Sequence, residues 1–315
     1  MKNLKKVLSL VLALAMALSL MTAAFAADAS DYKDYSKVTY KEAVDVMTAA
    51  GIFNGGDGNN FNPDATLNRE QAAKIITYML VGQTQADKLT TTIAPYSDVA
   101  ATRWSAGSIA YCTNEGIIAG DGNGRFNPTD GVTGLQFAKM LLVALGYDAK
   151  IENLVGNSWA INTAKLALGD ADLDNGMEEI SLSDNLTREQ AAQMAFNAMT
   201  ARMVDYTGGT NITTPDGTTI VVDADRYYVG HTTTTGYRMD VANDEYTQFC
   251  EQYASKLKLN KGSSDDLDRP SNEWVFENKS IGTYAQKAAV VYTADMNTDS
   301  GKKTVKNDLK NYYYG

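Results

Sequence analysis

Apolar side chains recur three and four residues apart in a set of similar stretches within the first 205 residues. This spacing places them on one face of an α-helix, and such a face must be buried against another element. Each stretch opens with a capping residue and, three residues later, a glutamine, so that side chains and backbone amides at the helix start exchange hydrogen bonds. The pairs are Asn68 with Gln71, Thr133 with Gln136, and Thr187 with Gln190. The pattern predicts three amphipathic helices that pack on one another.

Two of these stretches belong to an internal repeat. Residues 51–80 and 116–145 align without a gap, and both contain a turn rich in glycine and asparagine followed by Phe-Asn-Pro. A shorter helical pattern precedes each copy and stops at Gly51 or Gly116, as helices commonly do at glycine. A looser third copy opens with Trp159 and lacks the Phe-Asn-Pro turn, although it ends in a related Leu-Thr-Arg-Glu-Gln sequence.

The predicted fold class is mainly α, with one all-helical domain over about residues 30–205. Its three units span 30–82, 95–147 and 150–205. After residue 207 the sequence changes to threonine- and glycine-rich, strand-like segments, with one short helical stretch at 244–257 and a polar loop at 261–272. This change predicts a small β-rich or α+β module over residues 207–315.

The N-terminus has the layout of a secretory signal peptide. Lysines at positions 2, 5 and 6 precede an apolar run at residues 7–20, and the small-residue sequence Ala24-Phe25-Ala26 follows. The alternative, a membrane-spanning helix, is less favoured because the apolar run is short. We therefore expect residues 1–26 to be removed, and the mature chain to be secreted without membrane insertion.

The net charge of −10 and the isoelectric point near 4.7 argue against nucleic-acid binding and against broad attraction to an anionic membrane. An anionic partner would have to be held by a few local arginines. Arg69 and Arg188 each follow a helix cap directly, where a cation opposes the helix dipole. They are either solvated surface side chains or, together with free amides at the helix start, parts of an anion pocket. Gly134 takes this position in the second copy.

Signals for catalysis or metal binding are weak. His231 is the single histidine, so a His-based metal cluster is excluded by count and no Ser-His-Asp or Cys-His motif is recognisable. The glycine-rich turns lack the ending of a phosphate loop, and their Asp-x-Asn starts are incomplete calcium loops. Carboxylate pairs for glycoside hydrolysis stay open. We expect no catalytic residue, cofactor or metal. Cys112 and Cys250 either form a disulfide or stay as thiols.

The copies share a longer combined motif. In the second copy it runs from Trp104 through Gly116-Ile117-Ile118-Ala119-Gly120 to Phe126-Asn127-Pro128. The first and third copies add a Thr/Asn-Arg-Glu-Gln box at the start of their last helix. This motif strongly resembles the S-layer homology (SLH) domain. The resemblance covers about residues 30–205 and implies a pseudo-threefold bundle of three helix–turn–helix repeats. In that family such bundles hold exported proteins non-covalently on the walls of Gram-positive bacteria. The implied ligand is a secondary cell-wall polysaccharide, often bearing pyruvate ketals, bound in grooves between repeats.

The resemblance also implies glycan-binding residues. The family's arginine that contacts a ligand carboxylate corresponds to Arg69 and Arg188. The tryptophans and turn glycines at the grooves correspond to Trp104, Trp159, Gly51, Gly55, Gly116 and Gly120. The first copy has Thr39 in place of the tryptophan and the third lacks the turn, so we expect fewer than three competent grooves.

Two other roles stay open at this point. The module after residue 207 could make the chain a wall-associated carbohydrate hydrolase, with the helical repeats as its anchor. Alternatively, the chain could be a structural S-layer subunit that self-assembles at the surface.

Overall fold

A computed structural model describes residues 28–177, 180–208, 211–213, 219–221, 224–230, 244–286 and 297–304. The chain divides into two compact units, one of residues up to 260 together with 273–282, and one of residues 261–272 together with those from 283 onward. The expected signal peptide and His231 lie outside the described residues.

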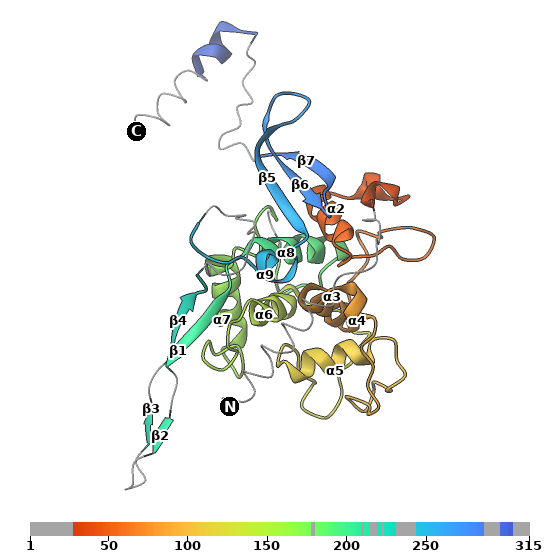
Figure 1. Cartoon of the computed structure of the whole chain (residues 1–315), viewed down its shortest axis with the longest axis vertical. Coiled ribbons are helices and arrows are strands. Elements are labelled where there is room, and N and C mark those ends of the chain that lie inside the picture. Colours follow the sequence, from red (N-terminus) through yellow and green to blue (C-terminus); the bar gives the residue numbers. More distant parts are fainter. Residues whose placement is uncertain are drawn as a thin grey trace. The chain divides into compact units, whose positions relative to one another are not determined.

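The helices of the first unit follow the order expected from the repeats (Figure 1). In the first copy these are the short 3₁₀ turns η1 (Ala29–Asp31) and η2 (Tyr35–Lys37), then α2 (Lys41–Ala49), α3 (Arg69–Val81) and α4 (Gln83–Ala86). In the second they are α5 (Ala106–Asn114) and α6 (Gly134–Ala144). In the third they are α7 (Trp159–Lys165), continued by the π-helical turn η3 (Leu166–Asp170), and α8 (Arg188–Thr200).

The capping boxes predicted from the sequence are confirmed in α3, α6 and α8. In α3, the Asn68 side chain accepts a hydrogen bond of 2.9 Å from the backbone N–H of Gln71, and the Gln71 side chain accepts one of 3.1 Å in return. The stop signals are confirmed too. Gly51 and Gly116 adopt φ angles of 71° and 72° directly after α2 and α5, a left-handed conformation that glycine takes without strain.

A closed ring of backbone hydrogen bonds joins the segments that lead into α3, α6 and α8. The N–H of Leu67 donates to the carbonyl oxygen of Leu186 at 2.9 Å, Leu186 donates to Val132 at 3.0 Å, and Val132 donates back to Leu67 at 3.0 Å. All three side chains are buried. Each segment therefore stands in the same relation to the next, and the three helices start from one shared centre.

The core of the first unit is built from the apolar stripes of these helices, as predicted. The buried members include Ile75, Ile76 and Met79 of α3, Phe137 and Leu141 of α6, and Met194, Ala195 and Met199 of α8. The repeat phenylalanines Phe61 and Phe126 are also buried, at 0% and 1% exposure. Full burial of a side chain of this size contributes about 1.5–3 kcal/mol, so the Phe-Asn-Pro turns are anchored into the core.

The strands lie after residue 203 (Figure 1). The antiparallel pairs are β1 (Val204–Gly208) with β4 (Ala224–Tyr228), and β2 (Asn211–Thr213) with β3 (Thr219–Val221). The helix α9 (Phe249–Tyr253) precedes a three-stranded sheet of β5 (Leu257–Ser264), β6 (Pro270–Phe276) and β7 (Lys279–Ala285) in the order β5-β6-β7. A β-rich region is therefore present. The predicted polar loop at 261–272 is wrong, because much of it belongs to β5 and β6, and the expected helix at 244–257 is confined to α9.

Segments beyond residue 207 pack on the helices of the first unit. The indole N–H of Trp274 in β6 donates to the Glu42 carboxylate at 2.8 Å, and the Trp274 ring meets Phe196 edge-on. The N–H of Phe249 donates to the carbonyl oxygen of Ala201 at 3.0 Å. The expected boundary near residue 207 therefore does not coincide with the edge of the first unit.

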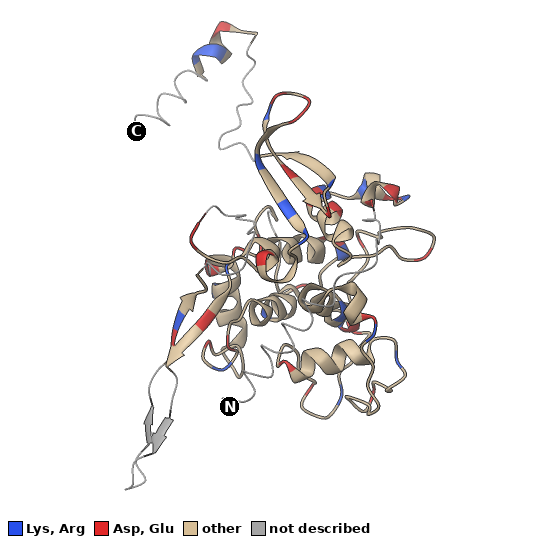
Figure 2. Cartoon of the chain, viewed as in Figure 1, with Lys and Arg blue, Asp and Glu red and all other residues tan. Residues whose placement is uncertain are grey.

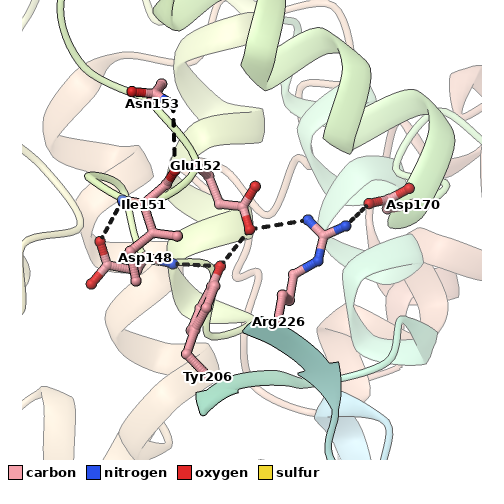
Figure 3. Close-up of polar contacts among 7 residues, drawn as sticks. All are labelled: Asp148, Ile151, Glu152, Asn153, Asp170, Tyr206 and Arg226. Carbon is pink, nitrogen blue, oxygen red and sulfur yellow. Dashed lines mark hydrogen bonds and ion pairs between the residues drawn. The ribbon is translucent and has the colours of Figure 1, made fainter. Parts of the chain in front are cut away.

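A polar cluster fixes the β1–β4 ribbon to the third copy (Figure 3). The Tyr206 hydroxyl donates to Glu152 Oε1 at 2.7 Å and accepts from the N–H of Asp148 at 3.1 Å. From β4, Arg226 bridges Glu152 and Asp170. Asp170 thus serves as an ion-pair partner in this cluster. Elsewhere in the described part, Lys and Arg are interspersed with Asp and Glu along the chain (Figure 2).

Candidate functional site

A cavity of about 290 Å³ lies where elements of all three copies meet. Its lining comes from the start of α3, the turn after α5, one face of α6, and the segment that leads into α7. The lining residues are Arg69, Ile117, Ile118, Ala119, Gly120, Gln136, Lys139, Met140, Leu154, Val155, Gly156 and Trp159. Three of the sequence-predicted site residues, Arg69, Gly120 and Trp159, are therefore brought together.

Arg69 is held against the turn of the second copy. Its Nε donates to the carbonyl oxygen of Phe126 at 2.8 Å, and Nη2 donates to Ala119 at 3.0 Å. The guanidinium lies 4.5 Å from the centroid of the Phe126 ring, a cation–π contact. Burial lowers the pKa of Arg69, while Tyr96 and nearby aspartates oppose that shift. A guanidinium stays protonated under these conditions, so the cavity has a fixed positive charge.

Arg188 repeats this geometry on the turn of the first copy. Its Nε donates to Phe61 at 2.9 Å, Nη2 donates to Asn54 at 3.0 Å, and the guanidinium lies 5.2 Å from the Phe61 ring centroid. Burial lowers the pKa of Arg188 as well. Among the described residues, no acceptor is bonded to Nη1 of either arginine. The interpretation of both as solvated surface side chains is therefore wrong, since each is half-buried and oriented by carbonyl groups.

The expected free amides at the helix starts are not free. The N–H groups of Arg69 and Glu70 donate to Asp130 and Pro128, both at 3.0 Å. In α8 the N–H of Arg188 donates to Ala65 at 2.9 Å. The backbone N–H groups at these helix starts are thus already hydrogen-bonded to another copy, and any anion must be bound through side chains.

Gly134 occupies the equivalent position at the start of α6, and its lack of a side chain has a steric reason. A Cβ atom there would lie 2.8 Å from the Cα of Leu182 and 3.0 Å from its carbonyl oxygen. The N–H of Gly134 donates to Asp184 at 3.0 Å, as the corresponding amides do in α3 and α8. The scaffold contact is therefore kept in this copy while the guanidinium is absent.

The two tryptophans differ in environment. Trp159 begins α7, is half-buried and lines the cavity. Trp104 precedes α5, is 58% exposed and is not among the lining residues. Such exposure argues against a packing role for Trp104 between helices.

The four predicted glycines serve the turns. A Cβ at Gly55 would lie 2.6 Å from a ring carbon of Tyr32, and one at Gly120 would lie 2.6 Å from a ring carbon of Tyr96. Gly51 faces the side chain of Gln83, whereas Gly116 faces open space. Of these four, Gly120 lines the cavity. Their recurrence is explained by chain geometry, and their contact with a ligand stays a prediction.

Sequence reasoning missed Gln136 and Lys139, which lie three residues apart on the cavity face of α6. Burial lowers the pKa of Lys139. Both residues follow the Thr133 cap at spacings that place them on one side of α6, but this spacing alone does not indicate that this side lines a cavity.

The two cysteines do not line the cavity. Cys112 and Cys250 are both buried free thiols, so the disulfide alternative is wrong. Burial raises the pKa of the Cys112 thiol to about 12 and that of Cys250 still further above its ordinary value. Within the described ranges, no group of three or more His, Cys, Asp or Glu side chains is placed to hold a metal ion.

Comparison with protein families finds two matches in the first half of the chain. Residues 31–73 and 95–138 match the S-layer homology domain. The chain contains two S-layer homology domains. The first SLH domain contributes Arg69, at the start of α3, to the cavity lining. The second contributes the turn with Gly120 and the first part of α6 with Gln136.

Related proteins come from bacterial surfaces. The chain is 31% identical over 157 residues to a surface layer protein of Brevibacillus choshinensis, covering 50% of this chain and 14% of that protein. It is 32% identical over 149 residues to a cell surface protein of Thermoanaerobacter kivui, covering 47% and 19%. An endoglucanase of Bacillus sp. (strain KSM-635) is 35% identical over 109 residues, covering 33% and 12%. The chain spans less than a fifth of the length of these curated relatives.

The SLH domains and the surface relatives indicate a secreted protein located at the cell wall and S-layer surface. None of the described helices has the length and apolar character needed to cross a membrane.

Proposed function

We propose that this chain is a wall-anchoring protein whose SLH repeats bind an anionic secondary cell-wall polysaccharide. The proposal includes a third, degenerate repeat at residues 150–205 and export through a signal peptide at residues 1–26. The observation that carries it is the cavity in which the Arg69 guanidinium, the Trp159 indole and the Gly120 turn meet.

The chemistry of this cavity suits a sugar that bears a carboxylate, such as a pyruvate ketal. A guanidinium donates charge-assisted hydrogen bonds to a carboxylate, and these are about twice as strong as neutral ones. Because Nε and Nη2 of Arg69 are already bonded to carbonyl oxygens, the side chain is oriented before any ligand arrives. The indole of Trp159 offers an apolar face on which a pyranose ring can stack.

The third repeat is supported by local structure. Helix α8 begins with the same capping box as α3 and α6, and Leu186 completes the ring of hydrogen bonds with Leu67 and Val132. Arg188 contacts the first SLH domain as Arg69 contacts the second.

Retention on purified cell walls tests the proposal. The full chain is mixed with walls before and after chemical extraction of the polymer that is not peptidoglycan. We expect sedimentation with intact walls and loss of binding after extraction. Equal binding to both preparations would show that the polymer is not the ligand.

A structural role in an S-layer is the second candidate, because relatives of this chain are surface layer proteins. Electron microscopy of the purified chain would reveal ordered two-dimensional arrays if it self-assembles. The hydrolase alternative has less support, since the endoglucanase match covers 33% of this chain, against 50% for the surface layer protein of Brevibacillus choshinensis. Release of reducing sugar from wall or plant glycans by the full chain would revive it.

A further inference from the structure

The cavity lining contains a second cation, Lys139. Its environment differs from that of the residues at the equivalent positions of α3 and α8. Lys139 is the sixth residue of α6, Lys74 is the sixth of α3 and Gln193 is the sixth of α8. These three positions are equivalent in the capping-box helices and can be compared directly.

Lys74 and Gln193 are satisfied within the chain. Lys74 Nζ lies 2.9 Å from Asp87 Oδ1 and also lies over the ring of Tyr78. Gln193 Nε2 donates to Asn197 Oδ1 at 2.8 Å and to the carbonyl oxygen of Asn175 at 3.3 Å. Lys139, in contrast, has no carboxylate partner among the residues that the structure describes. It is half-buried on the cavity wall, with Arg69 as the other charged lining residue.

The α4 segment accounts for the difference between the two copies. Asp87, directly after α4, pairs with Lys74 and accepts a hydrogen bond of 2.7 Å from the Tyr78 hydroxyl. The side chain of Gln83, the first residue of α4, comes within 2.7 Å of the Cβ position of Gly51. In the second copy the equivalent glycine, Gly116, faces open space. The chain thus places its own carboxylate and a covering side chain beside the first copy and leaves the second copy open.

We infer that Lys139 is a specificity-determining residue that contacts the anionic group of the ligand together with Arg69, which makes this cavity the principal binding groove. At Lys74 the carboxylate of Asp87 takes the position that the carboxylate of the ligand would take at Lys139. Lys74 is therefore not available to an external anion. This inference rests on the proposed function, because it names a second residue that reads the charge of the same ligand.

The test uses the full chain and sodium D-glucuronate, a pyranose with one carboxylate, with D-glucose as the neutral comparison. The chain has three tryptophans, so the ring C–H signals of Trp159, Trp104 and Trp274 can be followed separately by NMR. We expect glucuronate, but not glucose, to shift the Trp159 signals. The buried Trp274, bonded to Glu42, serves as the internal reference.

Matched variants isolate the lysine. Lys139→Gln is expected to weaken glucuronate binding about tenfold, the loss of roughly one charge-assisted contact. Lys139→Arg should restore most of it, and Lys74→Gln should leave it unchanged. Unaltered affinity in Lys139→Gln, or Trp159 signals that ignore glucuronate in the unmodified chain, would overturn the inference.

Wall retention separates this inference from the proposed function. Full retention of Lys139→Gln on intact walls would contradict the role of Lys139 while leaving wall anchoring in place. Glucuronate binding that depends on Lys139, without any retention of the unmodified chain on walls, would contradict wall anchoring and keep the role of Lys139.

Discussion

Arg188 Nε donates a hydrogen bond of 2.9 Å to the carbonyl oxygen of Phe61, which lies 127 residues earlier in the chain. The corresponding bond from Arg69 to Phe126 joins the first copy to the second. Each arginine expected at a binding groove therefore also holds two copies together through its hydrogen bond. Substitutions at these positions change stability and binding together, and the two effects must be measured separately.

Arg188→Ala is predicted to destabilise the chain. The change removes donors to the carbonyl oxygens of the buried Phe61 and the exposed Asn54, and an unsatisfied buried acceptor such as that of Phe61 typically costs about 1–3 kcal/mol. Urea unfolding followed by circular dichroism measures this loss. Lys88→Ala, at an exposed position, is the control. A midpoint that stays the same in Arg188→Ala would show that the two bonds contribute little.

Gly134→Arg is predicted to destabilise the chain rather than create another anion groove. Its Cβ would collide with the backbone of Leu182, and overpacking of this kind costs about 1–3 kcal/mol. The thermal midpoint of unfolding should fall. Gly169→Ala, where a Cβ meets open space, should change it little. A stable Gly134→Arg chain with stronger wall binding would contradict this explanation.

Binding of an anion should depend on pH at alkaline values. Burial lowers the pKa of Lys139 below the ordinary lysine value of about 10.4. The protonated form binds the anion, so affinity is fully present at neutral pH and falls as pH rises through this pKa. Glucuronate titrations monitored through the Trp159 ring signals, from pH 7 upward, give the profile. The decline should disappear in Lys139→Arg, since arginine keeps its charge over that range.

Arg226→Ala is predicted to loosen the β1–β4 ribbon without unfolding the helices. Arg226 joins β4 to Glu152 and Asp170 of the third copy (Figure 3). Partly exposed ion pairs contribute up to about 1 kcal/mol each. Hydrogen exchange should therefore quicken at the amides of β1 and β4 and stay slow in α3 and α6. Uniformly faster exchange would mean that the cluster stabilises the whole unit.

The elements that were predicted correctly are those specified by neighbouring residues. The cap Thr133 and its partner Gln136 are three positions apart, and Gly51 ends α2 by its own backbone geometry. In contrast, the composition of segment 261–272, which is polar apart from Leu267 and Pro270, predicts a loop. The segment forms parts of β5 and β6 because strand pairing supplies the missing stabilisation.

The candidate site could be predicted only in part for the same reason. Arg69 was recognised from its position after a cap, but its partners Phe126 and Ala119 lie more than 49 residues away. A lone lysine in a helix is usually solvated, and nothing near Lys139 in the sequence indicates otherwise. Its position with Trp159 in the cavity lining is visible only in the folded chain, and its lack of a carboxylate partner among the described residues stands out only beside the Lys74–Asp87 pair.

The closed hydrogen-bond ring limits how such a chain can be shortened or extended. A fragment ending at residue 147 would leave the N–H of Leu67 without its acceptor and the carbonyl of Val132 without its donor. The copies are therefore not independent folding units, since each one supplies a hydrogen-bond donor and an acceptor that its neighbours need in the ring. A fourth copy would likewise find every position in the ring occupied and would have to belong to a separate bundle.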